Sequence, residues 1–346
     1  MTHSSLHDAA EKEREDREMR NEGDIGLVLS GGGAKGAYQA GVWKAMCELG
    51  LARRVAAISG TSVGALNAAA FAAVGDPEEI CRFWRTRAEE VATPNLRNLS
   101  LDSLRRAAEN VLAGKAFPFH GLLDRSVLEG LIRELMPAEW PSDAPEVVAT
   151  SLECRGGLFG ELDSSSYRRK RFRIGDEPDA EKRLQELIAS AAIPWGFDPV
   201  EIDGRRYVDG GWDEKGGENV PATPILRDRP EIKIVVVVRC NSAEVDPEPL
   251  HVRPHRGTEV VEVRPSILLR GAFGDMSDLV PDVGFLAGIP VVDSLVQGVE
   301  AVVRQLRIWS GTFAFDGDCT SRFVRQGYAD GLAALRHLRP KEKLNW

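Results

Sequence analysis

The stretch that decides the fold is Val55-Ala56-Ala57-Ile58-Ser59-Gly60-Thr61-Ser62-Val63-Gly64. Its first half is a short apolar run that predicts a buried strand, and the Ala-rich segment behind it predicts a helix. The sharp turn between them has the G-x-S-x-G pattern of a nucleophile elbow, in which crowding leaves room only for glycine on both sides of the serine. We therefore take Ser62 as the candidate nucleophile, with Gly60, Thr61, Val63 and Gly64 as its elbow.

A second strand, turn and helix lies directly upstream. Residues 25–30 form an apolar run that ends in Gly31-Gly32-Gly33, and apolar residues recur at helical spacing from Tyr38 to Leu49. Two successive units of this kind are typical of a parallel α/β sheet with helices on its faces. Further strands are predicted at residues 147–150, 171–174 and 232–238, and helices between residues 77 and 135 with breaks near Pro94, Gly114 and Pro118.

The upstream glycine loop allows more than one interpretation. Gly31, Gly33 and Gly36 match the dinucleotide fingerprint G-x-G-x-x-G, but the acidic residue that should follow the second strand is missing, because that strand ends in Ser59-Gly60-Thr61. A phosphate-binding P-loop is excluded, since Ala37 stands where that motif requires lysine. Backbone N–H groups of such a loop bind negative charge, so the anion is either a phosphate or a transient oxyanion.

A serine nucleophile needs a base, and two residue types offer one. Six histidines occur at positions 3, 7, 120, 251, 255 and 337; none lies where an α/β hydrolase places its catalytic histidine, and only His120 remains a candidate. Asp209 follows a short strand in Tyr207-Val208-Asp209-Gly210-Gly211, and a carboxylate in a dry site can take the serine proton directly. An Asp-Gly turn between strands is the structural alternative.

Charge and composition exclude some functions. The chain of 346 residues has 44 Lys+Arg against 53 Asp+Glu, a net charge of −9, which argues against nucleic-acid binding. Its five cysteines include no C-x-x-C pair, so neither a zinc site nor a redox dithiol is predicted, and free thiols in a reducing compartment are indicated. No secretory signal is visible, and the uncharged residues 55–75 are interpreted as strand, turn and helix, not as a membrane span. We expect a cytoplasmic protein that can be peripheral at membranes.

The two ends of the chain differ in character. Residues 1–23 are highly charged and predict a solvated helix or a disordered tail, so the folded domain is expected to span residues 24–340. The apolar stretch between Ser266 and Trp309 is typical both of helices around an acyl site and of ordinary core helices. Residues 327–335 predict a short amphipathic helix docked on the sheet edge.

Together these segments resemble the patatin-like phospholipase family. Gly31-Gly32-Gly33-Ala34-Lys35-Gly36 resembles its glycine-rich oxyanion loop, the elbow around Ser62 its nucleophile motif, and Asp209-Gly210-Gly211 its catalytic Asp-Gly-Gly motif. Two further family segments match in order and spacing, at residues 190–200 and at Asn219-Val220-Pro221. The resemblance runs from about residue 25 to about residue 335, so only the charged N-terminus lies outside it.

The resemblance implies a three-layer α/β sandwich with a mostly parallel sheet, and a serine lipid acyl hydrolase that cleaves phospholipid or lysophospholipid esters. Under it, Ser62 attacks the acyl carbonyl, Asp209 accepts the proton, and N–H groups of Gly32, Gly33 and Ala34 bind the oxyanion. No metal or other cofactor is required. The implied partner is a lipid or membrane-surface substrate and not a nucleic acid, and whether a protein or small molecule activates the enzyme stays open.

Two departures from the family pattern bear on the site. Ala192 replaces a commoner serine, which we expect only to repack the wall, and residues Trp212 to Glu218 form an insertion that could reshape the surroundings of Asp209. Lys35 makes either an ion-pair or phosphate contact, or it is a solvated side chain. The alternative functions are a short-chain carboxylesterase and, in different classes, a nucleotide-binding protein that uses residues 31–36 or a scaffold that recruits a partner through its tail.

Overall fold

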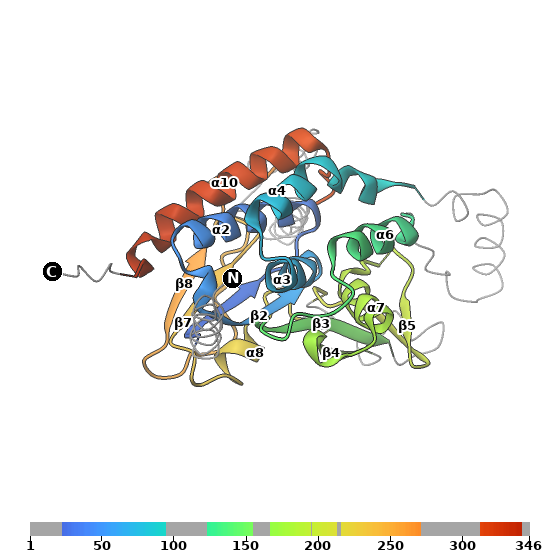
Figure 1. Ribbon diagram of the computed structural model, residues 1–346, viewed down its shortest axis with the longest axis horizontal. Helices are drawn as coiled ribbons and strands as arrows, with labels where there is room; N and C mark the ends of the chain where they lie inside the picture. Colours follow the sequence, from blue (N-terminus) through green and yellow to red (C-terminus); the bar gives the residue numbers. More distant parts are fainter. Residues whose placement is uncertain are drawn as a thin grey trace, which may run out of the picture.

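A single eight-stranded sheet forms the centre of the molecule, with strand order β5-β6-β3-β2-β1-β7-β8 and β4 paired to β3 (Figure 1). The computed structural model describes residues 23–94, 123–154, 167–194, 196–212, 216–270 and 312–340. The strands are β1 (Ile25–Leu29), β2 (Val55–Thr61), β3 (Glu146–Cys154), β4 (Tyr167–Arg173), β5 (Val200–Ile202), β6 (Arg205–Asp209), β7 (Ile234–Val238) and β8 (Glu259–Val263). Neighbours among β8, β7, β1, β2 and β3 are parallel, whereas β4, β5 and β6 join antiparallel. The predicted mostly parallel α/β fold is confirmed.

Several long helices cover one face of the sheet, and a short helix covers the other. Figure 1 shows one thick layer made of α2 (Gly36–Glu48), α3 (Val63–Ala73), α4 (Pro77–Thr86), α6 (Arg125–Leu135), α7 (Ala180–Ala191) and α10 (Gly317–Leu335). The short α8 (Thr223–Leu226) lies on the opposite face. Side chains of the central strands alternate between two cores: Val236 of β7 packs under the thick layer, while its neighbours Val235 and Val237 pack with Ile225 of α8. Burial on both faces explains why these strands are continuous apolar runs.

Most predicted elements are confirmed, with shifted ends. The five strands expected at residues 25–30, 55–59, 147–150, 171–174 and 232–238 correspond to β1, β2, β3, β4 and β7, and the first helix corresponds to α2. The uncharged stretch 55–75 is indeed strand, turn and helix, and no helix among the described residues is long and apolar enough to cross a bilayer. All five cysteines are free thiols.

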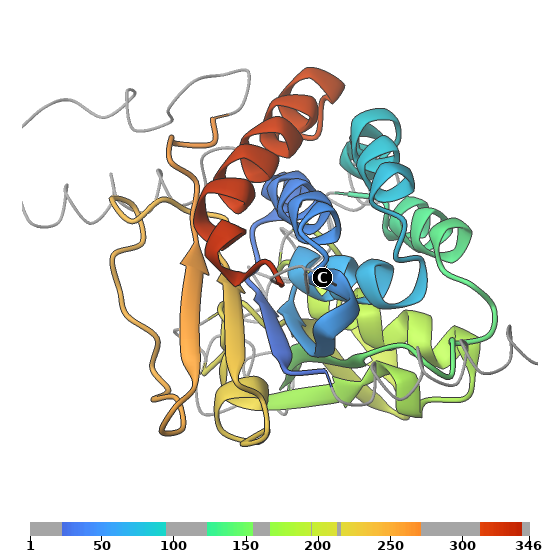
Figure 2. The same ribbon diagram turned by 60° about the vertical axis from the view of Figure 1, so that its left-hand side comes forward.

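The last helix differs from its prediction. We expected a short helix over residues 327–335 on the sheet edge, but α10 has 19 residues and begins at Gly317. Figure 2 shows α10 lying along α2. Polar contacts also join the two helices, because the Tyr38 hydroxyl donates to Asp330 at 3.2 Å and the Tyr328 hydroxyl bonds to Glu48. The helix therefore covers the outside of the thick layer and also contacts the edge strand β8.

Several expectations lie outside the described residues. These are the charged tail at residues 1–22, the helical region 95–122 with His120, and most of the apolar stretch 266–309. The proposed division of the chain near residue 23 is therefore still a prediction.

Candidate active site

The ends of β2 and β6 meet on β3. Thr61, the last residue of β2, pairs with Thr150, and Asp209, the last residue of β6, pairs with the adjacent Ser151. One strand is parallel to β3 and the other antiparallel, so they arrive from opposite directions. Because β4 occupies the other edge of β3 across both pairs, β2 and β6 share one edge. Topology thus brings Ser62, the residue after Thr61, and Asp209 to the same place, although they are far apart in sequence.

Ser62 has the backbone strain of a nucleophile elbow. Its φ of 57° and ψ of −131° lie in a region that non-glycine residues rarely adopt, and α3 begins at the next residue. The flanking glycines have no room for side chains, since a Cβ at Gly60 would lie 2.2 Å from the carbonyl oxygen of Gly64, and a Cβ at Gly64 would lie 2.3 Å from that of Leu29. The G-x-S-x-G pattern therefore has the steric cause that the sequence predicted.

The end of α7 holds the backbone on both sides of the site. The N–H of Ser62 donates to the hydroxyl of Ser190 at 3.0 Å, and the N–H of Asp209 donates to the carbonyl of Ala192 at 2.9 Å. Ser190 and Ala192, the residue directly after α7, are both fully buried. Ala192 therefore supports the candidate base through its backbone as well as packing the wall.

The Asp209 carboxylate is buried, with 6% of the residue exposed. Its Oδ1 accepts a hydrogen bond from the N–H of Gly211 at 2.7 Å, which fixes the orientation of the carboxylate. A Cβ at Gly210 would lie 2.2 Å from the carbonyl oxygen of Thr150, so the turn after Asp209 is pressed against β3. The Asp-Gly-Gly sequence forms a turn, and that turn presents its carboxylate inside the molecule.

The glycine loop 31–36 lies against Ser62. A Cβ at Gly31 would lie 3.2 Å from Cβ of Ser62 and 2.5 Å from Oδ1 of Asn219. Three N–H groups of the loop already have backbone partners: those of Gly31, Ala34 and Lys35 donate to the carbonyls of Asn219, Thr312 and Gly32, at 3.0, 2.8 and 3.2 Å. Within the described residues, the N–H groups of Gly32 and Gly33 donate to no backbone carbonyl. The N–H of Ala34 is thus already engaged, those of Gly32 and Gly33 have no backbone carbonyl partner there, and an oxyanion hole formed by this loop stays a prediction.

Lys35 is buried, which rules out the solvated alternative. Only 1% of the residue is exposed, and Nζ donates to Oδ1 of Asn241 at 2.6 Å. Burial lowers the pKa of the Lys35 ammonium to about 8, and the nearby groups of Cys240 and Asp246 partly oppose this shift. Gly36 begins α2, and its carbonyl accepts a hydrogen bond from the side chain of the buried Asn67 at 2.9 Å. The loop is therefore tied to the core at both ends.

One cavity of about 1230 Å³ connects these groups. Its lining includes Ser62, Asp209, Gly211 and the loop residues Gly31, Gly32, Gly33 and Lys35. Apolar side chains form part of its wall, namely Leu123, Ile193, Pro194, Leu250, Val252 and Phe313. The remaining motif residues, Ala34, Gly36, Gly60, Thr61, Val63, Gly64 and Gly210, lie behind this surface and shape it. Among the described residues, no cluster of three or more His, Cys, Asp or Glu could hold a metal ion.

Three of the six histidines lie in the described part of the chain. His251 lines the cavity wall and is exposed, His255 contacts the carbonyl of Arg227, and His337 contacts Glu259. None of them hydrogen-bonds Ser62 there.

Three residues that hold the site together have no role that their sequence predicts. Ser190 and Asn219 lie in segments that resemble the family, and Glu218 ends the insertion after Asp209. A serine or glutamate at the end of an element gives no sign by itself that it holds another segment of the chain.

Comparison with known proteins identifies the family. The model of the patatin-like phospholipase family matches residues 27–225, which is more than half of the chain. The chain belongs to the patatin-like phospholipase family, and this membership supports a lipid hydrolase. No curated protein sequence matches the chain.

The solved structures that match this chain have low sequence identity to it. Human GIVD cytosolic phospholipase A2 is 14% identical, with 97% of this chain and 64% of that chain covered and a TM-score of 0.42. VipD from Legionella pneumophila is 20% identical, with 62% of this chain and 50% of that chain covered and a TM-score of 0.34. ExoU from Pseudomonas aeruginosa, in complex with SpcU, is 13% identical, with 91% and 53% covered and a TM-score of 0.37. The chain thus spans half to just under two thirds of the length of these proteins.

Proposed function

We propose that this chain is a serine lipid acyl hydrolase with a Ser62–Asp209 dyad. The observation that carries the proposal is that the elbow serine, the buried aspartate and the glycine loop line one cavity. Strained backbone at Ser62 supports the role of nucleophile, since such strain clusters at catalytic positions. Family membership supports lipid esters as the substrate class.

The reaction would proceed in two halves. Ser62 Oγ attacks the carbonyl carbon of the ester while Asp209 takes the hydroxyl proton, and the N–H groups of Gly32 and Gly33 stabilise the resulting oxyanion. The tetrahedral intermediate collapses to an acyl-enzyme, and the leaving alcohol takes the proton from Asp209. Water then attacks the acyl carbonyl, gives its proton to Asp209, and releases the fatty acid as Ser62 recovers its hydrogen.

The cavity favours a long apolar acyl group over a small ester. Its volume exceeds the roughly 300–1,000 Å³ typical of drug-sized ligand pockets, so an acyl chain and part of a glycerol backbone can enter together. Apolar side chains on its wall would replace water around the chain. We therefore propose phospholipase A or lysophospholipase activity at a membrane surface, in preference to a short-chain carboxylesterase.

Lipid mass spectrometry tests the proposal. Purified protein is incubated with phosphatidylcholine vesicles, with lysophosphatidylcholine micelles and with p-nitrophenyl butyrate, and free fatty acid or p-nitrophenol is measured. We expect Ser62→Ala and Asp209→Asn each to lower the rate on the lipids by on the order of 10³-fold or more. A faster reaction with p-nitrophenyl butyrate than with either lipid would favour the carboxylesterase.

A matched serine variant controls for the substitution. Ser126 lies at the start of α6, where, within the described ranges, its hydroxyl hydrogen-bonds the capping Asp124 and no residue of the candidate site, so Ser126→Ala should keep the wild-type rate. A fluorophosphonate probe should label wild-type protein and Ser126→Ala but not Ser62→Ala. Undiminished fatty-acid release by pure Ser62→Ala protein would disprove the dyad.

A further inference from the structure

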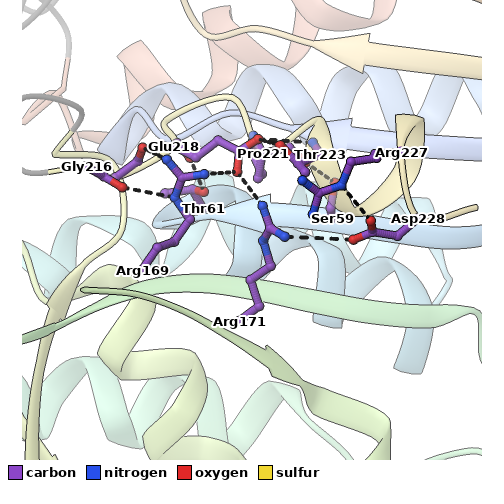
Figure 3. Close-up of polar contacts among 11 residues, drawn as sticks. Ser59, Thr61, Arg169, Arg171, Gly216, Glu218, Pro221, Thr223, Arg227 and Asp228 are labelled. Carbon is purple, nitrogen blue, oxygen red and sulfur yellow. Dashed lines mark hydrogen bonds and ion pairs between the residues drawn. The ribbon is translucent and has the colours of Figure 1, made fainter. Parts of the chain in front are cut away.

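Glu218, the last residue of the insertion after Asp209, is buried with a fully hydrogen-bonded carboxylate. Only 8% of the residue is exposed. Its Oε2 accepts hydrogen bonds from Arg169 at 3.0 Å and Arg171 at 2.9 Å. Its Oε1 accepts from both the N–H and the hydroxyl of Thr223, at 3.0 and 2.6 Å. Figure 3 shows both guanidinium groups pointing toward Glu218.

The backbone of Glu218 contacts the neighbours of both dyad residues. Its N–H donates to the carbonyl of Gly210, directly after Asp209, at 2.8 Å. Its carbonyl accepts from the hydroxyl of Thr61, directly before Ser62, at 2.7 Å. The next residue, Asn219, accepts the N–H of Gly31 on its carbonyl at 3.0 Å. Two consecutive residues therefore touch the Asp-Gly-Gly turn, the elbow and the glycine loop.

Arg169 also binds the two residues before Glu218. Its Nε donates to the carbonyl of Gly216 at 3.0 Å, and its Nη2 donates to that of Gly217 at 2.6 Å. Arg169 and Arg171 alternate with residue 170 along β4, so their side chains leave the strand on the same side. Because β4 pairs with β3 along seven residues, both guanidinium groups are anchored to the sheet that positions the site.

The charges explain why the insertion can be held in place. A buried carboxylate is strongly unfavourable unless it is paired and hydrogen-bonded, and charge-assisted bonds of this kind are about twice as strong as neutral ones. Glu218 meets that condition with two guanidinium groups, and removal of the charge would leave both without their shared acceptor. Glu218 therefore connects the arginines of β4 to Thr61 and to Gly210.

We propose that Glu218, held by Arg169 and Arg171, is a positioning residue that fixes the Asp209 turn against the nucleophile elbow. This inference rests on the proposed function for its catalytic consequence, because it concerns the alignment of Ser62 with Asp209. Residues 216–218 at the end of the insertion are then part of the catalytic framework. Displacements near 1 Å of reacting groups typically lower rates by up to about 100-fold, which sets the size of the expected effect.

The first test is Glu218→Gln in the full chain, with lysophosphatidylcholine hydrolysis as the assay. The variant keeps the shape and the acceptor for Thr223 but turns an amide N–H₂ toward the two arginines. We expect kcat to fall about 10- to 100-fold with KM changed by less than about two-fold, since alignment and not substrate binding is affected. Fluorophosphonate labelling of Ser62 should slow in parallel.

Hydrogen exchange provides a readout that does not depend on activity. The amides of Gly31 and Glu218 donate the bonds that close this arrangement, so peptides containing them should exchange about ten times faster or more in Glu218→Gln. Arg173→Met is the matched control, because Arg173 lies two residues further along β4, pairs with Glu146 and does not contact Glu218. It should keep wild-type kcat and wild-type exchange.

Single variants at the two arginines keep the test decisive if Glu218→Gln fails to fold. Arg169→Met and Arg171→Met each leave Glu218 one guanidinium partner, and each should lower kcat more than Arg173→Met does. Where Glu218→Gln folds, adding Arg171→Met should lower kcat by no more than about three-fold further, because the two residues act as one unit.

Two results separate failure of this inference from failure of the proposed function. Wild-type kcat and exchange in Glu218→Gln, in an enzyme that Ser62→Ala inactivates, would overturn the positioning role and leave the dyad intact. Full activity of Ser62→Ala would instead overturn the dyad. Accelerated exchange in Glu218→Gln would in that case still show that Glu218 holds these segments together. An equal loss of kcat in Arg173→Met would also overturn the positioning role.

Discussion

The hydroxyl of Ser190 accepts the N–H of Ser62 at 3.0 Å and donates to the carbonyl of Thr150 at 2.5 Å. One buried side chain thus joins the strained elbow to the strand beside it. The strain at Ser62 persists only if its surroundings hold it, and this hydrogen bond is one of the contacts that do so.

Replacement of Ser190 should therefore affect both stability and rate. Ser190→Ala leaves the buried N–H of Ser62 and carbonyl of Thr150 without this partner, which should lower the free energy of unfolding by about 1–3 kcal/mol. We expect kcat to fall about ten-fold or more as the elbow relaxes. Urea unfolding and steady-state hydrolysis measure the two effects. A wild-type kcat in a destabilised variant would show that Ser190 has no influence on the elbow.

A pair of glycine variants tests the sterics of the elbow. Gly64 lies in α3 and Gly130 in α6, so Gly→Ala raises helix propensity at both positions. At Gly64 the added Cβ would lie 2.3 Å from the carbonyl oxygen of Leu29, whereas at Gly130 it would meet nothing within 4 Å. We expect Gly64→Ala to lose activity and more than about 2 kcal/mol of stability, and Gly130→Ala to gain about 0.5–1 kcal/mol. Thermal unfolding with equal Tm for both variants would contradict this explanation.

Local patterns with a strict steric cause could be predicted from sequence. The elbow around Ser62 requires glycine at positions 60 and 64, because backbone carbonyls crowd both. The apolar runs predict the buried strands β1, β2 and β7 because both faces of the sheet are covered. The carbonyl that crowds Gly60 belongs to Gly64, four positions further along the chain, whereas the one that crowds Gly64 belongs to Leu29 on β1. The G-x-S-x-G pattern and the apolar runs are nevertheless visible within a few consecutive residues.

Contacts between distant segments could not be predicted. Lys35 is buried because it meets Asn241, 206 residues further along the chain. The same holds for Glu218, whose charge is matched by an arginine 49 residues before it. A lysine in a first helical turn or a glutamate in a glycine-rich loop ordinarily faces solvent, so only the fold reveals these partners.

Burial of Lys35 predicts an unusual pH dependence of stability. Its pKa is about 8 in the folded protein against 10.5 for a free lysine. Between these pH values the unfolded chain holds a proton that the folded chain has released, so the free energy of unfolding rises with pH across this window. The free energy of unfolding of wild type, measured relative to that of Lys35→Met, should therefore rise by about 3 kcal/mol from pH 8 to 10.5.

Urea unfolding of both proteins at pH 7, 8, 9, 10 and 10.5 measures that gain. Lys44→Met is the control, because Lys44 lies on α2, the helix that Lys35 precedes, and its pKa is raised by a hydrogen bond to Glu78, which reverses the sign of the pH effect. A constant difference between wild type and Lys35→Met would contradict the predicted burial of the ammonium.

Glu186 of α7 should show the opposite sign at lower pH. Burial, with a smaller contribution from Glu177, raises its pKa from 4.5 to about 7, and no hydrogen-bond donor within the described residues reaches its Oε2. Between pH 4.5 and 7 the folded protein keeps a proton that the unfolded chain releases, so stability falls as pH rises. Glu186→Gln removes this penalty and should be more stable than wild type by up to about 3 kcal/mol above pH 7, but not near pH 4.5.

The control is Glu181→Gln, at an exposed position on the same helix where the carboxylate pairs with Arg133. It should change the free energy of unfolding by less than about 1 kcal/mol at any pH. Unfolding curves of the three proteins from pH 4.5 to 8 measure these differences. If the stability difference between Glu186→Gln and wild type does not grow with pH, the carboxyl is already charged in the folded protein at the lower pH values.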